Sequence, residues 1–132
     1  MLQRVIAVIA GTVAAVVTVG VVEGVGHAVF PPPPGIDIAD PAALADVMHR
    51  IPLGAKVAVV LAWAMGSLVG GWVAARFSRD RRVGASLVVG LLMLAAGGYT
   101  IAAIPHPRWM ASLGLLLPLP MAWLGARLRA GA

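Results

Sequence analysis

Four long apolar segments dominate the sequence, at about residues 5–30, 53–75, 83–104 and 109–128. A helix needs about 20 apolar residues to cross the hydrocarbon core of a bilayer, and each segment reaches that length. In lipid, every backbone N–H and C=O must be paired inside the segment, which makes helices the default. The sequence therefore predicts an all-α fold: a four-helix transmembrane bundle that forms a single domain over residues 1–132, surrounded by the lipid bilayer.

The composition agrees with a chain whose outer surface meets lipid. Hydrophobic residues make up 61% of the chain and charged residues 11%, far less charge than the surface of a soluble domain carries. The sequence has no cysteine, which excludes disulfides, thiol catalysis and cysteine metal sites. The formal charge of +5 does not indicate a nucleic-acid partner, because the basic residues follow the ends of the segments. The first apolar run is longer than that of a signal peptide, so we expect it to remain as a span.

The basic residues predict which way the chain crosses the membrane. Seven of the ten fall on one face: Arg4, Arg76, Arg79, Arg81, Arg82, Arg127 and Arg129. Positive charge is retained in the cytosol, so both termini are expected there. The other face receives all three histidines and four of the five acidic residues. In a bacterium, this describes a multi-pass protein of the inner membrane whose polar side chains gather on the outer face.

Small residues predict where the helices pack. Gly66, Gly70 and Gly71 lie on stripes of Gly, Ala and Ser in the second segment, and Gly20 and Gly24 lie one turn apart in the first. Small residues let helix backbones approach closely in lipid. These five glycines are therefore predicted as helix–helix contacts. The stripes on the second segment also offer a surface for a homo-oligomer or a larger membrane complex.

Prolines are expected to shape the fourth segment and the first outer loop, residues 31–52. Pro118 and Pro120 each remove an intrahelical hydrogen bond, which predicts a kink. In the loop, Asp40 and Pro41 are a favoured N-cap and first-turn residue for a short helix that ends at about Arg50. Its apolar side chains fall on one face: Leu44, Val47, Met48 and Ile51. We expect this amphipathic helix to rest on the membrane surface or to cap the bundle.

Glu23 and His27 are the main candidates for chemistry. They share one face of the first segment with Gly20 and Gly24, and that face is expected to point into the bundle. An ionisable side chain within a span is by default a functional-site hypothesis. His106, held between two prolines, lies at the same membrane face. Two histidines and a carboxylate suit zinc or another divalent metal ion, so the three form a candidate metal site, with a structural polar contact as the alternative.

Several short motifs resemble a family of small four-helix bacterial membrane proteins. They are Glu23-Gly24-Val25-Gly26-His27, Phe30-Pro31-Pro32-Pro33, Gly35-Ile36-Asp37 and Ile104-Pro105-His106-Pro107, with Trp109 after the last. The resemblance covers nearly the whole chain. It implies four spans, and it brings no activity, ligand or cofactor with it.

Three classes of function remain open. The sequence has no phosphate loop, nucleophile elbow or HExxH motif, which favours a non-enzymatic accessory protein or a bundle that binds a lipid or another lipophile. The second class is the handling of metal ions or protons at Glu23, His27 and His106. The third, a membrane enzyme that acts on an outer-leaflet substrate through the same residues, has the least support.

Overall fold

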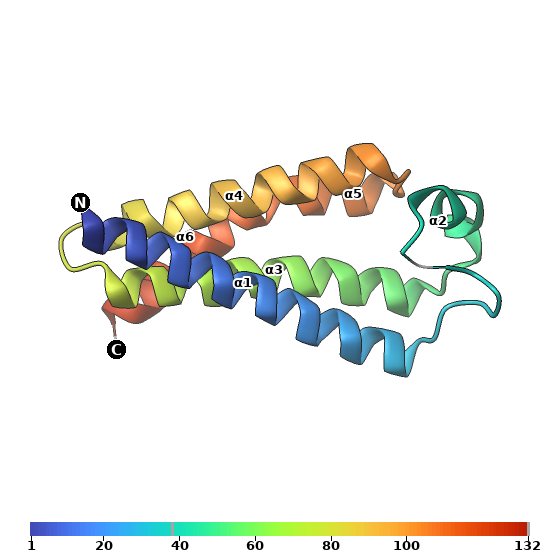
Figure 1. The fold of residues 1–132 in the computed structure, drawn as a ribbon, viewed down its shortest axis with the longest axis horizontal. Coiled ribbons are helices and arrows are strands. Elements are labelled where there is room, and N and C mark those ends of the chain that lie inside the picture. The colour runs from blue at the N-terminus through green and yellow to red at the C-terminus, as the bar shows by residue number, and fades with distance from the viewer. Residues whose placement is uncertain (38, 132) are drawn as a thin grey trace.

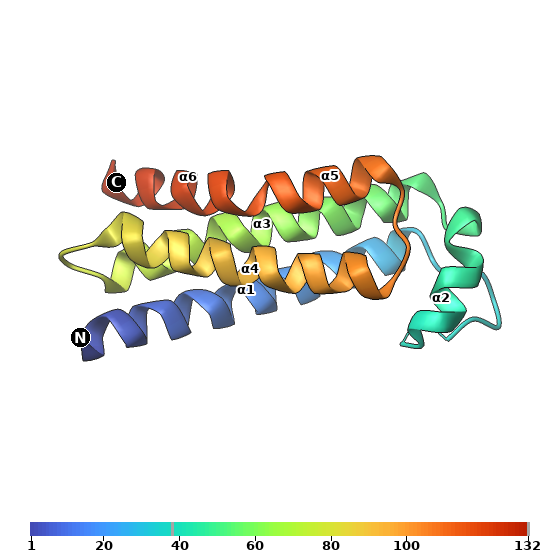
Figure 2. The same ribbon diagram turned by 90° about the horizontal axis from the view of Figure 1, so that it is seen from above.

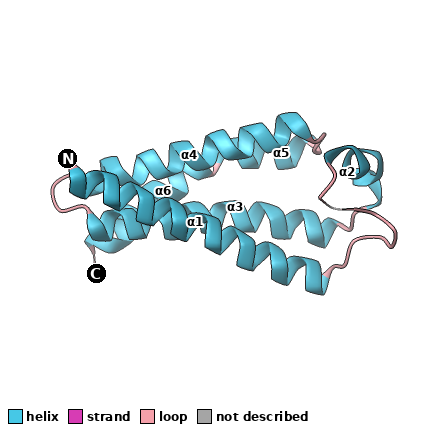
Figure 3. Ribbon diagram, in the orientation of Figure 1, coloured by secondary structure: helices cyan, strands magenta, loops and turns pink. Residues whose placement is uncertain are grey.

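The computed structural model describes residues 1–37 and 39–131, and its ordered elements there are helices. Four spans are long and apolar enough to cross a membrane: α1 (Leu2–Val29), α3 (Leu53–Phe77), α4 (Arg82–Ala103) and the pair α5 (Arg108–Leu116) and α6 (Pro118–Ala130). Figures 1 and 3 show them as one elongated bundle. The predicted all-α four-helix bundle is confirmed, and the predicted segments agree with the helices to within a few residues.

The two ends of the bundle differ. Both termini and the α3–α4 loop lie at one end, which we call the arginine-rich end after the arginines of residues 76–82 (Figures 1 and 2). The short helix α2 (Pro41–Val47) and the α4–α5 turn lie at the other, the α2 end. Helix α3 is the most buried of the four spans, and it packs against each of the other three.

Close packing around α3 depends on glycine. A Cβ on Gly70 would lie 2.7 Å from the carbonyl oxygen of Gly11 in α1, and Gly66 is packed as tightly against the same helix. Gly71 is buried on the α6 side, where a Cβ would overlap the backbone of Ala122. The three glycines predicted on the second segment are therefore helix contacts, as expected. Since these contacts lie within one chain, the stripes are not left free for a second copy.

The prediction that Gly20 and Gly24 are helix contacts is wrong. Both are exposed, and a Cβ on either would meet no atom of another element within 4 Å. The buried residues of α1 are others: Ala7, Gly11, Ala15 and Gly26. The reason is that α1 packs on α3 through these buried residues, and Gly20 and Gly24 lie on another side of the helix.

The fourth span is divided at Leu117, directly before the first of its two prolines. Pro118 has no N–H to donate to the carbonyl of Gly114, so the regular pattern stops there. The N–H of Leu117 still donates to the carbonyl of Leu113 at 2.9 Å, and the N–H of Met121 donates to that of Leu117 at 3.0 Å. These flanking bonds keep α5 and α6 aligned as one span, as Figure 2 shows.

Large apolar side chains cover the outside of the bundle. One stripe of α1 is more than half exposed: Val13, Val17, Val21 and Val25. A continuous apolar exterior of this kind suits hydrocarbon and not water. The chain therefore has the character of a multi-pass membrane protein.

One buried hydroxyl links α4 to α3. The Oγ of Ser86 lies 2.6 Å from the carbonyl oxygen of Gly71 and 2.9 Å from that of Arg82 in its own helix. A serine hydroxyl has one proton, so it donates to one of the two carbonyls at a time. The bond to Gly71 fixes the relative height of the two helices on the arginine-rich side of the bundle.

Candidate binding cavity

A cavity of about 440 Å³ lies between the helices at the α2 end. It is present because α1 and α4 diverge there, whereas nearer the arginine-rich end they join in one apolar core with α3 (Figure 1). Its volume is within the range of small-molecule sites, roughly 300–1,000 Å³. Residues of α1, α3, α4 and α5 form its walls.

The deep part of the cavity, its floor, is apolar. It is lined by five side chains: Val16, Val19, Trp63, Met93 and Ala96. Along α1, the lining runs from Val16 to His27, a rise of roughly 16 Å at 1.5 Å per residue. Half of a hydrocarbon core of about 30 Å has a similar length. The cavity is therefore about as deep as one leaflet of a bilayer.

Polar side chains are confined to the outer part of the cavity, its mouth. They are Glu23, His27, Lys56, Thr100 and His106. Each lies within two turns of the loop end of its helix, or in the α4–α5 turn itself. The cavity is thus apolar in its deep part and carries both polar and apolar side chains at its mouth, an arrangement that suits a lipid with an apolar tail and a polar head group.

The short helix α2 and the 3-10 turn η1 (Met48–Arg50) lie at the mouth. The carboxylate of Asp40 caps α2 by accepting a hydrogen bond of 3.0 Å from the N–H of Ala42. Three side chains of the predicted apolar face line the cavity: Leu44, Met48 and Ile51. Part of the predicted apolar face therefore lies at the open end of the bundle, against the cavity.

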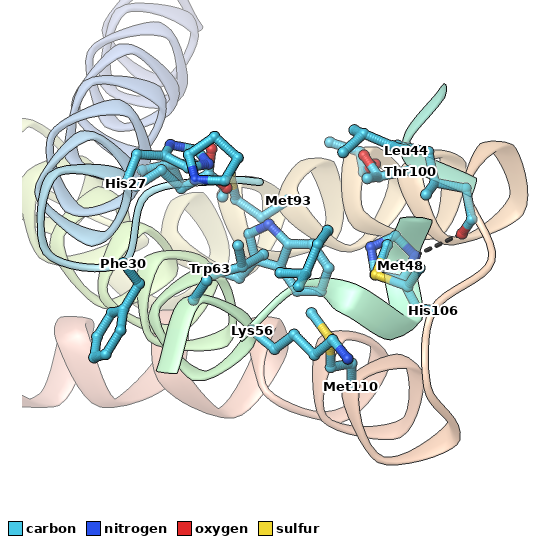
Figure 4. Close-up of a pocket in the computed structure, with 18 of the residues that line it drawn as sticks. His27, Phe30, Leu44, Met48, Lys56, Trp63, Met93, Thr100, His106 and Met110 are labelled. Carbon is cyan, nitrogen blue, oxygen red and sulfur yellow. Dashed lines mark hydrogen bonds between the residues drawn. The ribbon is translucent and has the colours of Figure 1, made fainter. Parts of the chain in front are cut away.

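Trp63 and His106 stand together in the wall of the cavity. Their ring centroids are 5.9 Å apart, and the ring planes are tilted by 54°. The Nδ1 of His106 lies 2.6 Å from the carbonyl oxygen of Ile104, shown by the dashed line in Figure 4. Because a carbonyl oxygen only accepts, this contact requires the proton on Nδ1, and it leaves Nε2 of the neutral ring as an acceptor.

The three predicted metal ligands all line this cavity. Glu23 is half-buried and His27 is exposed, and Figure 4 shows His27 and His106 on opposite sides of Trp63. Within the part of the chain that the structure describes, no three His, Cys, Asp or Glu side chains are grouped so as to hold a metal ion. The metal site stays a prediction, whereas the shared position of the three residues at the mouth is a feature of the structure.

Several lining residues were not singled out from the sequence. Lys56 is the only lysine of the chain and falls inside a predicted segment. An ionisable residue within a span is a candidate for a functional site. Thr100, at the outer end of the third segment, has no such signal. Trp63 and Met93 also have none, because aromatic and thioether side chains are ordinary in spans. Their place in the cavity depends on how the helices are arranged.

No protein-family model matches the chain, and no curated protein or solved structure is significantly similar to it. The resemblance noted from the sequence therefore rests on its motifs alone. Three residues of those motifs, Glu23, His27 and His106, belong to the mouth of the cavity.

Proposed function

We propose that the protein is a non-enzymatic membrane protein that binds a lipid-like amphiphile in this cavity. The tail lies on the apolar floor and the head group at the polar mouth, beneath α2. The observation that supports this most directly is that the polar side chains of the lining lie only in the outer part of a cavity about as deep as one leaflet. A soluble polar ligand would leave the floor unused, and a pure hydrocarbon would leave the mouth unused.

The mouth favours an amphiphile with an anionic head group. Lys56 supplies a positive charge on a long, flexible stem, and its side chain is half-buried in the lining. Among the described residues, Glu23 is the one acidic side chain of the lining, and it lies one turn from His27. A carboxylate or phosphate head group near Lys56 would be paired there. A cationic head group would meet Glu23 instead, so the charge preference can be measured.

The same proposal includes the orientation of the chain. The seven arginines that the sequence assigns to the cytosol gather at the arginine-rich end, with both termini. On this basis the termini face the cytosol of a bacterium, the cavity opens in the outer leaflet of the inner membrane, and α2 lies on the periplasmic side. The ligand would therefore be an outer-leaflet amphiphile.

Filling the floor of the cavity tests the proposal. Ala96 lines the cavity and Ala95, its neighbour on α4, does not, although both are exposed. We expect wild-type protein and the Ala95→Trp variant, purified in mild detergent, to retain a single amphiphile per chain when extracts are quantified by mass spectrometry. We expect Ala96→Trp, at unchanged helical circular dichroism, to lose most of it. Equal retention in both variants, or no stoichiometric amphiphile in the wild type, would contradict the proposal.

A further inference from the structure

A second hollow, of about 460 Å³, opens at the arginine-rich end. It is formed by the α3–α4 loop, the first turn of α4 and the end of α6. Five charged side chains line it: Arg79, Asp80, Arg81, Arg82 and Arg127. Four positive charges and one negative charge give the lining a formal charge of +3. It shares no lining residue with the cavity at the α2 end.

The hollow lies at the depth of lipid head groups. The guanidinium carbon of Arg127 is 4.8 Å from the ring centroid of Trp123, one turn earlier on α6. Trp123 is 42% exposed on the outside of the bundle. Exposed tryptophan concentrates at the boundary between hydrocarbon and water. The arginine stacked on it is therefore level with the phosphates of the adjacent leaflet.

The lining combines charge with small apolar groups. Val83, Ala126 and Ala130 share the hollow with the arginines. Arginine presents a planar fork of N–H donors that matches two phosphate oxygens at once. The apolar residues suit the glycerol and the first methylene groups that follow a lipid phosphate, and they would contribute nothing to binding of a free inorganic ion. The uncapped first turn of α4 adds a weaker positive field, but the four arginines dominate.

We propose that this hollow binds the head group of an anionic phospholipid, with the phosphodiester held by Arg79, Arg82 and Arg127. Basic pockets between spans on the cytosolic side are suited to such head groups. A zwitterionic head group carries a compensating ammonium, which the +3 lining disfavours. This site rests on the orientation proposed above but shares no lining residue with the amphiphile cavity, so binding at either site can fail alone.

Lipid titration of the full chain in detergent, followed by native mass spectrometry, tests the site. The probes are phosphatidylglycerol and phosphatidylcholine with the same acyl chains. We expect the wild type to bind phosphatidylglycerol at least about tenfold more tightly than phosphatidylcholine. Glycerol phosphate, the soluble head group, is not expected to compete at the same concentrations.

A matched pair of variants locates the binding. Arg79→Gln, Arg82→Gln and Arg127→Gln together remove three charges from the hollow. Arg4→Gln, Arg76→Gln and Arg129→Gln together remove three charges from the same end but outside its lining. The first set is expected to lose about tenfold or more in phosphatidylglycerol affinity, and the second less than about threefold.

Three results would overturn the proposal. The first is an equal loss of phosphatidylglycerol affinity in both variant sets, which would mean that binding depends on the general positive charge of this end and not on the hollow. The second is equal affinity of the wild type for the two lipids, a measurement that needs no variant to fold. The third is full competition by glycerol phosphate, which would make the hollow a site for soluble phosphate esters.

Discussion

A Cβ on Gly114 would lie 2.5 Å from Cζ3 of the Trp63 indole ring, so α5 presses directly on the wall of the cavity. Real Cβ atoms do not approach a ring so closely, and Gly114 is therefore the residue that lets Trp63 lie where it does. The same glycine precedes Pro118 by four residues, the position whose carbonyl a proline ring crowds. Gly114 therefore makes room both for the Pro118 ring in the fourth span and for the Trp63 ring in the wall of the cavity.

Replacing Gly114 by alanine is expected to destabilise the protein. The added methyl group must displace the Trp63 ring, and overpacking of this kind costs about 1–3 kcal/mol. The free energy of unfolding in mixed detergent micelles measures the effect. Gly20→Ala is the control, because its methyl group enters open space and should leave the stability nearly unchanged. Equal stability of the two variants would mean that Gly114 and Trp63 are not in contact.

Removing the hydroxyl of Ser86 is expected to weaken the contact between α3 and α4. Hydrogen bonds between helices in a membrane contribute about 0.6 kcal/mol on average, and Ser86→Ala should lose a similar amount in the same unfolding experiment. Ser112→Ala is the matched control, because the exposed Ser112 bonds only to the carbonyl of Arg108 in its own helix. A larger loss for Ser112→Ala would argue against the bond between Ser86 and Gly71.

Lys56 is expected to set the preference for anionic amphiphiles. Lys56→Gln should weaken binding of a fatty acid about fivefold, equivalent to about 1 kcal/mol, and leave binding of the fatty alcohol of the same length unchanged. Glu23→Gln removes a negative charge instead of a positive one and should strengthen fatty-acid binding. Competition against a fluorescent fatty acid provides the measurement. Arg50→Gln is the control, because Arg50 is not part of the lining. An equal loss of fatty-acid affinity in Arg50→Gln would mean that Lys56 has no specific role.

The absence of native cysteine makes the orientation simple to test. Asp46 lies on the exposed side of α2, and Asp80 lies in the α3–α4 loop. We expect a maleimide that reaches the periplasm but does not cross the inner membrane to label Asp46→Cys in intact cells. Asp80→Cys should react only after the inner membrane is permeabilised. The reverse pattern would place the cavity in the cytosolic leaflet.

The spans and the short helix α2 could be predicted because their signals are local. Apolar length fixes a transmembrane helix without reference to its neighbours. Asp40 and Pro41 start α2 by a capping interaction between adjacent residues, and Pro118 breaks the fourth span by its missing N–H. In each case the deciding atoms are within a few residues of one another.

The inward face of α1 and the cavity could not be predicted in this way. Gly20 and Gly24 are spaced by four residues, but so are Gly11 and Ala15, and the sequence does not distinguish the two stripes. Which stripe of α1 is buried depends on the angle between α1 and α4, and this angle depends on packing along the whole bundle. The same divergence opens the cavity and separates His27 from His106. Among the described residues, the three candidate ligands therefore share the mouth of the cavity, and their use as metal ligands stays a prediction.

Quenching of Trp63 fluorescence tests amphiphile binding most directly, because this ring lines the floor of the cavity. The variant needed retains Trp63 and carries phenylalanine at Trp72, Trp109 and Trp123. A fatty acid brominated on its tail is titrated into the protein in detergent. We expect saturable quenching at one fatty acid per chain, reversed by unlabelled fatty acid. A variant that retains only the lipid-facing Trp72 should show weak, non-saturating quenching. If Trp63 is quenched no more than Trp72, with no saturation, the cavity does not bind an acyl chain.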